Sequence, residues 1–223
     1  MKILHLETSS KNCSVAISDG EKLLCVCEEI SENYKQSENL HTFVEWALEG
    51  AEISLNDLDA IALGKGPGSY TGLRIGAASA KGFCYALNIP LLAVNSLETM
   101  VEPFLNHHFD HIIPMVDARR MEVYTAVYDG KTGENLTTTE AKILDDNAFH
   151  EFKDKNVLFV GDGAKKASEI LNLPKAVFNS EVFPSARYLV KKSAQLFINQ
   201  EFQDVAYFEP FYLKEFQGTK KKP

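Results

Sequence analysis

Clustered hydrophobic positions separated by polar residues predict three strands at the start of the chain. The apolar runs at 2–8, 12–18 and 21–29 are short and bounded by polar residues, which is typical of strands. The pair Asp19-Gly20 separates the second and third runs, and such a pair favours a tight hairpin turn. We therefore expect the chain to open with a three-stranded antiparallel meander.

Helix-like and strand-like runs alternate after this meander. A helix is predicted at about 37–49, because its apolar residues recur at i, i+3, i+4, i+7 and i+8. These residues are Leu40, Phe43, Val44, Ala47 and Leu48. A buried strand at 58–63, a second helix at about 70–87 and a strand at 90–94 follow. A short helix then ends near Pro103.

The same order of elements then partly repeats. The predicted strands are 112–117, 121–128, 135–144 and 157–161, and the predicted helices lie at about 146–152, after Gly163, and at about 185–201. Three strands followed by alternating helices and strands, twice over, is the pattern of a duplicated ribonuclease-H-like fold. We therefore expect an α/β chain with two such domains, at 1–104 and 105–223, each opening with a three-stranded antiparallel meander.

Composition and charge narrow the classes of function. The chain has 223 residues, and its 45% hydrophobic content is ordinary for a globular protein. It contains no apolar run of about 18 residues, so no membrane span is predicted. Because the formal net charge is −8, strong direct binding to nucleic acid is disfavoured. The basic tail Lys220-Lys221-Lys222 is the local exception, and we expect it to be a solubilising end.

Four cysteines are present, and their spacing argues against a metal or redox motif. Cys25 and Cys27 are separated by one residue, whereas zinc knuckles and redox pairs use two. Cys13, Cys25 and Cys27 lie in strand-like runs. We therefore expect buried, reduced thiols in a cytoplasmic protein.

The segment GKGPGSYTGLRIG, residues 64–76, resembles a phosphate-binding loop because its glycines precede a helix. A P-loop needs a lysine after its last glycine, and a dinucleotide fingerprint needs a third glycine where Thr71 stands. A helix N-terminus still favours an anion, so nucleotide binding stays open. The residues expected closest to a nucleotide are Glu7, Ser9, Gly66, Gly68 and Ser69.

The second helix carries a stripe of small residues. Gly72, Gly76 and Ala80 recur every four residues, and each interior glycine costs about 1 kcal/mol relative to alanine. Such a stripe allows another backbone to approach closely, either within the same domain or from a partner helix. For the second alternative, the predicted interface is Leu40, Val44, Tyr70, Gly72, Leu73, Arg74, Gly76, Ala77 and Ala80.

Several polar residues raise a catalytic or metal-binding alternative. His41 and Glu45 stand at i and i+4, a spacing that fits an acid–base pair but is more typical of a partly solvated polar pair. His107, His108 and His111 cluster at the predicted domain boundary and could bind a metal ion. Two adjacent histidines in a loop are, however, poorly placed to bind the same ion. An internal ion pair between Asp117 and Arg119 is a further hypothesis.

Eight short motifs, in order, match one known family. They are Glu7-Thr8-Ser9, Cys13-Ser14-Val15-Ala16, GPGSYTGLRIG at 66–76, Ala80-Lys81-Gly82, Asp117-Ala118-Arg119, Glu122-Val123-Tyr124, Gly161-Asp162-Gly163 and Glu209-Pro210-Phe211-Tyr212-Leu213. With these motifs, over nearly its whole length, the chain resembles the bacterial TsaB (YeaZ) proteins. The segment 66–76 is the most specific of them.

The resemblance implies the two-domain ASKHA fold of actin-like and Hsp70-like ATPases. It implies a role in forming N6-threonylcarbamoyladenosine at adenosine 37 of tRNAs that read ANN codons. The family member is a non-catalytic dimerisation subunit, which pairs with the catalytic paralogue TsaD through helices of its first domain and is joined by the ATPase TsaE. A homodimer competes with this pair, and tRNA is reached only through the complex. The complex uses ATP and threonylcarbamoyl-AMP, and we expect this chain alone to hold no cofactor stably.

The non-catalytic role implied by the resemblance can be compared with the residues themselves. The paralogue carries H-x-E-x-H on the helix after its fifth strand, which puts two histidine ligands on one helical face. Here Ser96 and Met100 replace the histidines, while Glu98 is retained. The segment 161–167, GDGAKKA, stands in place of the paralogue's nucleotide loop and is poorer in glycine. We expect no metal site and no catalytic residue; the alternatives are a metal-dependent glycoprotease-like peptidase and a free-standing ATPase.

Overall fold

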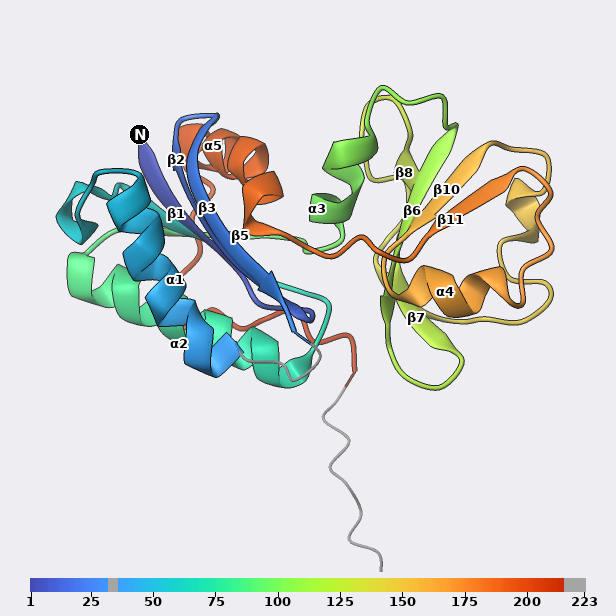
Figure 1. Ribbon diagram of the computed structural model, residues 1–223, viewed down its shortest axis with the longest axis horizontal. Coiled ribbons are helices and arrows are strands. Elements are labelled where there is room, and N and C mark those ends of the chain that lie inside the picture. Colours follow the sequence, from blue (N-terminus) through green and yellow to red (C-terminus); the bar gives the residue numbers. More distant parts are fainter. Residues whose placement is uncertain (32–35, 215–223) are drawn as a thin grey trace, which may run out of the picture.

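The computed structural model describes residues 1–31 and 36–214, and these residues form two lobes that lie side by side (Figure 1). Each lobe is built on one β-sheet with helices packed on it. The chain leaves the first sheet after residue 94, and residues 97–101 already pack on the second sheet; it returns to the first lobe near residue 184. The predicted basic tail at Lys220 to Lys222 lies outside the described residues.

The first sheet has the strand order β3-β2-β1-β4-β5. Its strands are β1 (Lys2–Glu7), β2 (Asn12–Asp19), β3 (Lys22–Ile30), β4 (Ala60–Gly64) and β5 (Leu91–Val94). The first three strands pair antiparallel, whereas β4 and β5 run parallel to β1. The opening meander predicted from the sequence is therefore confirmed.

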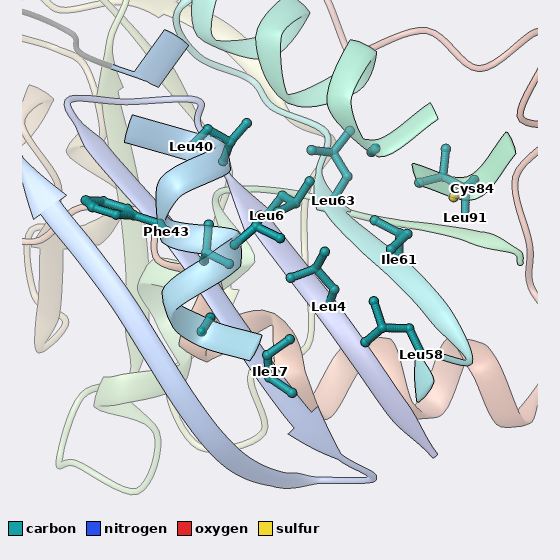
Figure 2. Close-up of a cluster of buried hydrophobic side chains, with 14 of the residues drawn as sticks. Leu4, Leu6, Ile17, Leu40, Phe43, Leu58, Ile61, Leu63, Cys84 and Leu91 are labelled. Carbon is teal, nitrogen blue, oxygen red and sulfur yellow. The ribbon is translucent and has the colours of Figure 1, made fainter. Parts of the chain in front are cut away.

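Helices cover both faces of this sheet, which explains why β1 is buried on both sides. The helices α1 (Gln36–Gly50) and α2 (Tyr70–Leu87) pack on one face, over Leu4, Leu6, Ile61 and Leu63 (Figure 2). The alternate residues Ile3, Ala60, Ala62 and Leu92 face Leu196 and Phe197 of α5 (Val190–Ile198). Burying one such leucine fully contributes about 1.5–3 kcal/mol, so this two-sided core holds the lobe together.

The second sheet has the equivalent order β11-β10-β6-β7-β9. Its strands are β6 (His111–Asp117), β7 (Glu122–Thr125), β8 (Tyr128–Asp129), β9 (Glu140–Ile143), β10 (Val157–Val160) and β11 (Ala176–Asn179). As in the first sheet, the second strand pairs antiparallel with the first, and the last two run parallel to it. This repeated topology is that of the ASKHA fold, so the predicted duplication is confirmed.

Details of the second lobe differ from the prediction. The run predicted as one strand at 121–128 is two strands, β7 and β8, which both pair with β6. The predicted strand at 135–144 is shortened to β9, and the predicted helix at 146–152 is a single 3-10 turn, η3 (His150–Phe152). The remaining short elements are η1 (Leu55–Asp57), α3 (Glu98–Val101), η2 (Glu102–Phe104) and α4 (Gly163–Ser168).

The chain returns to the first lobe through a polar anchor around Glu28. Ser185 donates a hydrogen bond to the Glu28 carboxylate at 2.6 Å, and Asn12 donates to the Pro184 carbonyl at 3.0 Å. The predicted helix at 185–201 then forms as η4 (Ala186–Leu189) and α5, both against the first sheet. The predicted division of the chain into domains at 104/105 stays a prediction. Residues of the segment 185–208 nevertheless pack on the first sheet.

After α5, residues 203–214 form what we call the C-terminal strap. Gln203 donates a backbone hydrogen bond to the carbonyl of Leu91, the first residue of β5, and Phe208 is buried in the main core of the first lobe. The Lys81 ammonium on α2 donates to the Ala206 carbonyl at 3.0 Å. The strap ends at Lys214, which forms an ion pair with Glu122 of the second lobe. It therefore runs from the edge of the first sheet to the gap between the lobes.

Candidate functional site

The glycine-rich segment packs against the connection between β1 and β2. Ser69, the residue before α2, donates its backbone N–H to the Ser9 carbonyl at 2.6 Å. The Thr8 hydroxyl donates to the Gly72 carbonyl at 2.8 Å. A Cβ at Gly68 would overlap the Ser9 backbone, and a Cβ at Gly72 would overlap the Thr8 carbonyl oxygen. These glycines therefore serve close backbone packing within the first lobe.

The predicted partner interface is corrected in most of its members. Gly76 also faces Thr8, since a Cβ there would overlap the Thr8 hydroxyl oxygen. Six further predicted residues are buried, namely Leu40, Val44, Gly72, Leu73, Ala77 and Ala80. A residue inside the lobe cannot contact a partner, so the stripe of small residues is a packing feature. Of the predicted set, Tyr70 and Arg74 are the ones that reach the surface.

The solvent side of α2 carries a different set of small residues. Arg74, Ala78, Gly82 and Tyr85 are exposed at helical spacing, and we call them the outer α2 face. Tyr85 is 88% exposed, and a Cβ added at Gly82 would meet nothing within 4 Å. This face is therefore open, flat around Ala78 and Gly82, and bordered by two large side chains.

The helix α1 lies beside this face. The His41 ring is hydrogen-bonded to the Ser79 hydroxyl at 3.0 Å and meets the Phe83 ring edge-on at 5.8 Å. His41 thus joins α1 to α2, which gives it a structural role. Among the described residues, no group of three or more His, Cys, Asp or Glu side chains is placed to hold a metal ion.

The positions of the paralogue's histidine ligands are used for packing. Ser96 is fully buried and accepts a hydrogen bond from the Gly66 backbone N–H at 3.1 Å. Met100 is also fully buried, and its sulfur lies 3.2 Å from the place of a Cβ at Gly161. Glu98 is half-buried, and this burial raises its pKa against the opposing charges of two lysines. A serine and a methionine held in this way offer no ligand pair for a metal.

A cleft of about 1230 Å³ separates the lobes. Ser9, Gly68 and Ser69 line one wall, and the residues 116–120 at the end of β6 line the other. Lysine and arginine side chains from both walls border it, among them Lys11, Arg119, Arg120, Lys165 and Lys214. The described part of the chain thus has space for a ligand between its lobes, and the strap residues 211–214 lie along it.

Two residues expected near a nucleotide do not line this cleft. Glu7 is fully buried at the end of β1, where its carboxylate accepts the Ser9 N–H at 2.8 Å. Burial raises the pKa of Glu7, and a Cβ at Gly64 would overlap its side chain. Gly66 is also buried, behind the loop. Ser9, Gly68 and Ser69 remain as predicted nucleotide-proximal residues on the cleft wall.

The second-lobe wall is held by backbone contacts. The Asp117 carboxylate accepts the Arg119 N–H at 2.6 Å and pairs with the Lys166 ammonium at 2.9 Å. The predicted ion pair between Asp117 and Arg119 is therefore corrected to a pair with Lys166. Arg119 and Arg120 both have left-handed backbones, with φ of 66° and 54°. Non-glycine residues adopt this conformation rarely, so the turn holds both side chains at the cleft edge.

Comparison with known proteins agrees with this architecture. A family model described as "TsaD: tRNA N6-adenosine threonylcarbamoyltransferase" matches residues 28–214. The tRNA threonylcarbamoyladenosine biosynthesis protein TsaB of Bacillus subtilis is 35% identical over 167 residues, which are 72% of this chain and 71% of that protein. TsaB of Escherichia coli is 29% identical over 237 residues, covering 100% of this chain and 99% of that protein. The chain belongs to the TsaB (YeaZ) family.

Comparison with solved structures supports the same family assignment. YeaZ from Pseudomonas aeruginosa superimposes with a TM-score of 0.78 at 25% identity, over 95% of this chain and 99% of that one. No helix in the described part of this TsaB-family chain is long and apolar enough to cross a membrane.

The sequence did not reveal the outer α2 face or the C-terminal strap as parts of one surface. The helix α2 has small residues on two sides, and periodicity alone does not say which side faces the sheet. The strap has no regular secondary structure, so its motif, 209–213, carried no structural signal. The exposed Gly82 within a helix was the available clue, because an interior glycine without packing needs another reason.

Proposed function

We propose that this chain is a non-catalytic partner subunit in the biosynthesis of threonylcarbamoyladenosine in tRNA. It pairs with a TsaD-like catalytic paralogue through the outer α2 face, and a TsaE-like ATPase joins the pair. The observation that carries the proposal is the open stripe of Ala78 and Gly82 between Arg74 and Tyr85. The names of its relatives, which are tRNA threonylcarbamoyladenosine biosynthesis proteins, support the pathway.

The chemistry of the outer α2 face suits a helix from another chain. Helices pack with their axes about 8–10 Å apart, and small side chains at the contact allow the closer end of this range. Arginine and tyrosine are enriched among the residues that dominate interface energies. Arg74 and Tyr85 stand on either side of the small residues, so they can anchor the rim while Ala78 and Gly82 form the contact.

The residues at the positions of the paralogue's histidine ligands support a non-catalytic role. Ser96 and Met100 are fully buried in packing contacts, so the chain lacks the ligand pair that transfer chemistry in the paralogue uses. We propose that ATP and threonylcarbamoyl-AMP are handled by the complex and that this chain alone holds neither stably. With a net charge of −8, the chain reaches tRNA indirectly, through its partners.

A single exposed substitution tests the partner face. Gly82→Trp places a large side chain on the outer α2 face, and the open space around Gly82 lets the variant fold. Ser168→Trp is the matched control, because Ser168 is exposed on α4 of the second lobe. In light scattering with the TsaD-like protein of the same organism, we expect Ser168→Trp to form a one-to-one complex and Gly82→Trp to stay separate. Normal pairing by a folded Gly82→Trp variant would refute the assignment.

The same face is available to a second copy of this chain. A homodimer and the complex then compete for Ala78 and Gly82, so the substitution Gly82→Trp should abolish both associations. Loss of only one of them would mean that the two associations use different surfaces.

A further inference from the structure

The C-terminal strap stacks on Tyr70, which lies one helical turn before Arg74 of the outer α2 face. The Tyr212 ring lies 4.7 Å from the Tyr70 ring, centroid to centroid, with the planes tilted by 36°. The Tyr70 hydroxyl accepts a hydrogen bond from the Arg74 guanidinium at 2.8 Å, and that guanidinium lies 4.2 Å from the Tyr70 ring centroid. A continuous series of contacts therefore runs from the strap to an exposed residue of the outer α2 face.

Both sides of Tyr212 are anchored. The Phe211 backbone N–H, directly before it, donates to the Lys65 carbonyl at 2.8 Å in the glycine-rich segment. Lys214, two residues after it, pairs with Glu122 of the second lobe. The chain is thus tied to a different lobe on each side of Tyr212, and these ties place the Tyr212 ring against Tyr70.

Arg74 is the residue at the end of this series that faces solvent. A long exposed side chain normally samples many rotamers, and binding a partner then requires that freedom to be lost. The contacts with Tyr70 restrict the guanidinium before any partner arrives. Tyr70 is the first residue of α2 and is itself only half-buried, so the stack on Tyr212 contributes to its orientation.

We propose that Tyr212 is a positioning residue for partner binding, which acts through Tyr70 to hold Arg74 in the orientation that the partner recognises. This inference rests on the proposed function, since it deepens the role of the outer α2 face. It predicts that removing the Tyr212 ring weakens pairing although Tyr212 lies outside that face. Losing the restriction of one side chain should weaken pairing about 3- to 10-fold.

The test is a double-mutant cycle on the dissociation constant of the complex with the TsaD-like protein, measured by titration calorimetry. The four proteins are the unchanged chain, Tyr212→Ala, Arg74→Ala and the double variant. Since Tyr212 acts through Arg74, the double variant should bind as weakly as Arg74→Ala alone. Tyr212→Phe keeps the ring and should bind as the unchanged chain does.

Two further variants separate positioning from general destabilisation. Tyr212→Leu keeps an apolar side chain without the ring, and it should show the same loss as Tyr212→Ala. Phe202→Ala removes another aromatic contact near the C-terminal strap. The ring centroids of Phe202 and Phe197 are 5.6 Å apart, and Phe197 packs on the face of the first sheet opposite to α2. This control should lower thermal stability and leave the affinity unchanged.

Several results would overturn the inference. Losses that multiply in the double variant would show that Tyr212 and Arg74 act independently, and unchanged affinity of Tyr212→Ala and Tyr212→Leu would show that the ring is not needed. In both cases the partner face itself survives if Arg74→Ala weakens pairing. If neither Arg74→Ala nor Gly82→Trp affects pairing, the proposed face fails and this inference fails with it.

Discussion

Two glycines of one helix should respond oppositely to the same substitution. Gly72 faces the Thr8 backbone, whereas Gly82 faces open solvent. Replacing glycine by alanine inside a helix stabilises the folded state by about 0.5–1 kcal/mol where space allows. Gly82→Ala should therefore raise the free energy of unfolding by about that amount.

At Gly72 the new methyl group would overlap the Thr8 carbonyl oxygen. Thr8 is fully buried and is tied to Gly72 by its own hydroxyl, so its backbone cannot move away freely. Overpacking of this kind costs about 1–3 kcal/mol, and the gain in helix propensity offsets part of it. We expect Gly72→Ala to lower the free energy of unfolding by about 1–2 kcal/mol.

The assay is thermal unfolding followed by the fluorescence of Trp46. The chain has one tryptophan, and it lies on α1, so the signal reports the first lobe even if the lobes unfold separately. For a protein of this size, 1 kcal/mol shifts Tm by about 2–4 °C. Gly72→Ala should therefore melt lower and Gly82→Ala higher than the unchanged chain. If Gly72→Ala raises Tm as Gly82→Ala does, the glycines do not serve packing on residues 8 and 9.

Three further outcomes are expected. Burial disfavours the charged form of Glu28, but the hydrogen bond from Ser185 and the charge of Arg187 outweigh this effect and lower the pKa of Glu28. The stability that the charged carboxylate contributes is therefore lost as pH falls below 4.5. Urea unfolding of Glu28→Gln should lack this acid-dependent loss, and equal acid sensitivity of the variant and the unchanged chain would contradict the anchor. Because Glu7 is sealed from the cleft, the isolated chain should show no saturable ATP binding up to about 1 mM by calorimetry. The purified chain should carry no stoichiometric zinc or iron by elemental analysis; one metal per chain would revive the peptidase alternative.

Local patterning predicted most of the first lobe. The apolar spacing from Leu40 to Leu48 identified α1, and the predicted second helix has the bounds of α2. Apolar residues that recur about every 3.6 positions line one face of an α-helix and do not fit a strand. The predicted strand at 121–128 failed where β7 ends and β8 begins. Ala126 and Val127, between them, are buried like strand residues, so nothing in the pattern marks the interruption.

Long-range placement was beyond the sequence pattern. An amphipathic run such as α5 shows that one face is buried, but not that it returns to the first sheet. The same limit left the direction of the small-residue stripe open, since small residues lie on two sides of α2 and only the packing on Thr8 assigns Gly72 and Gly76 inward. For Glu7, a carboxylate at a strand end is normally exposed, and its burial depends on Gly64 from another strand.

The central claim is that this chain acts by pairing through the outer α2 face. The most direct measurement is light scattering during size-exclusion chromatography of the chain mixed with the TsaD-like protein of the same organism, with and without Gly82→Trp. We predict that the unchanged chain forms a one-to-one complex, which replaces any homodimer. The Gly82→Trp variant should not form this complex, although its Trp46 melting curve shows that it is folded. An unchanged complex with the folded variant would contradict the account.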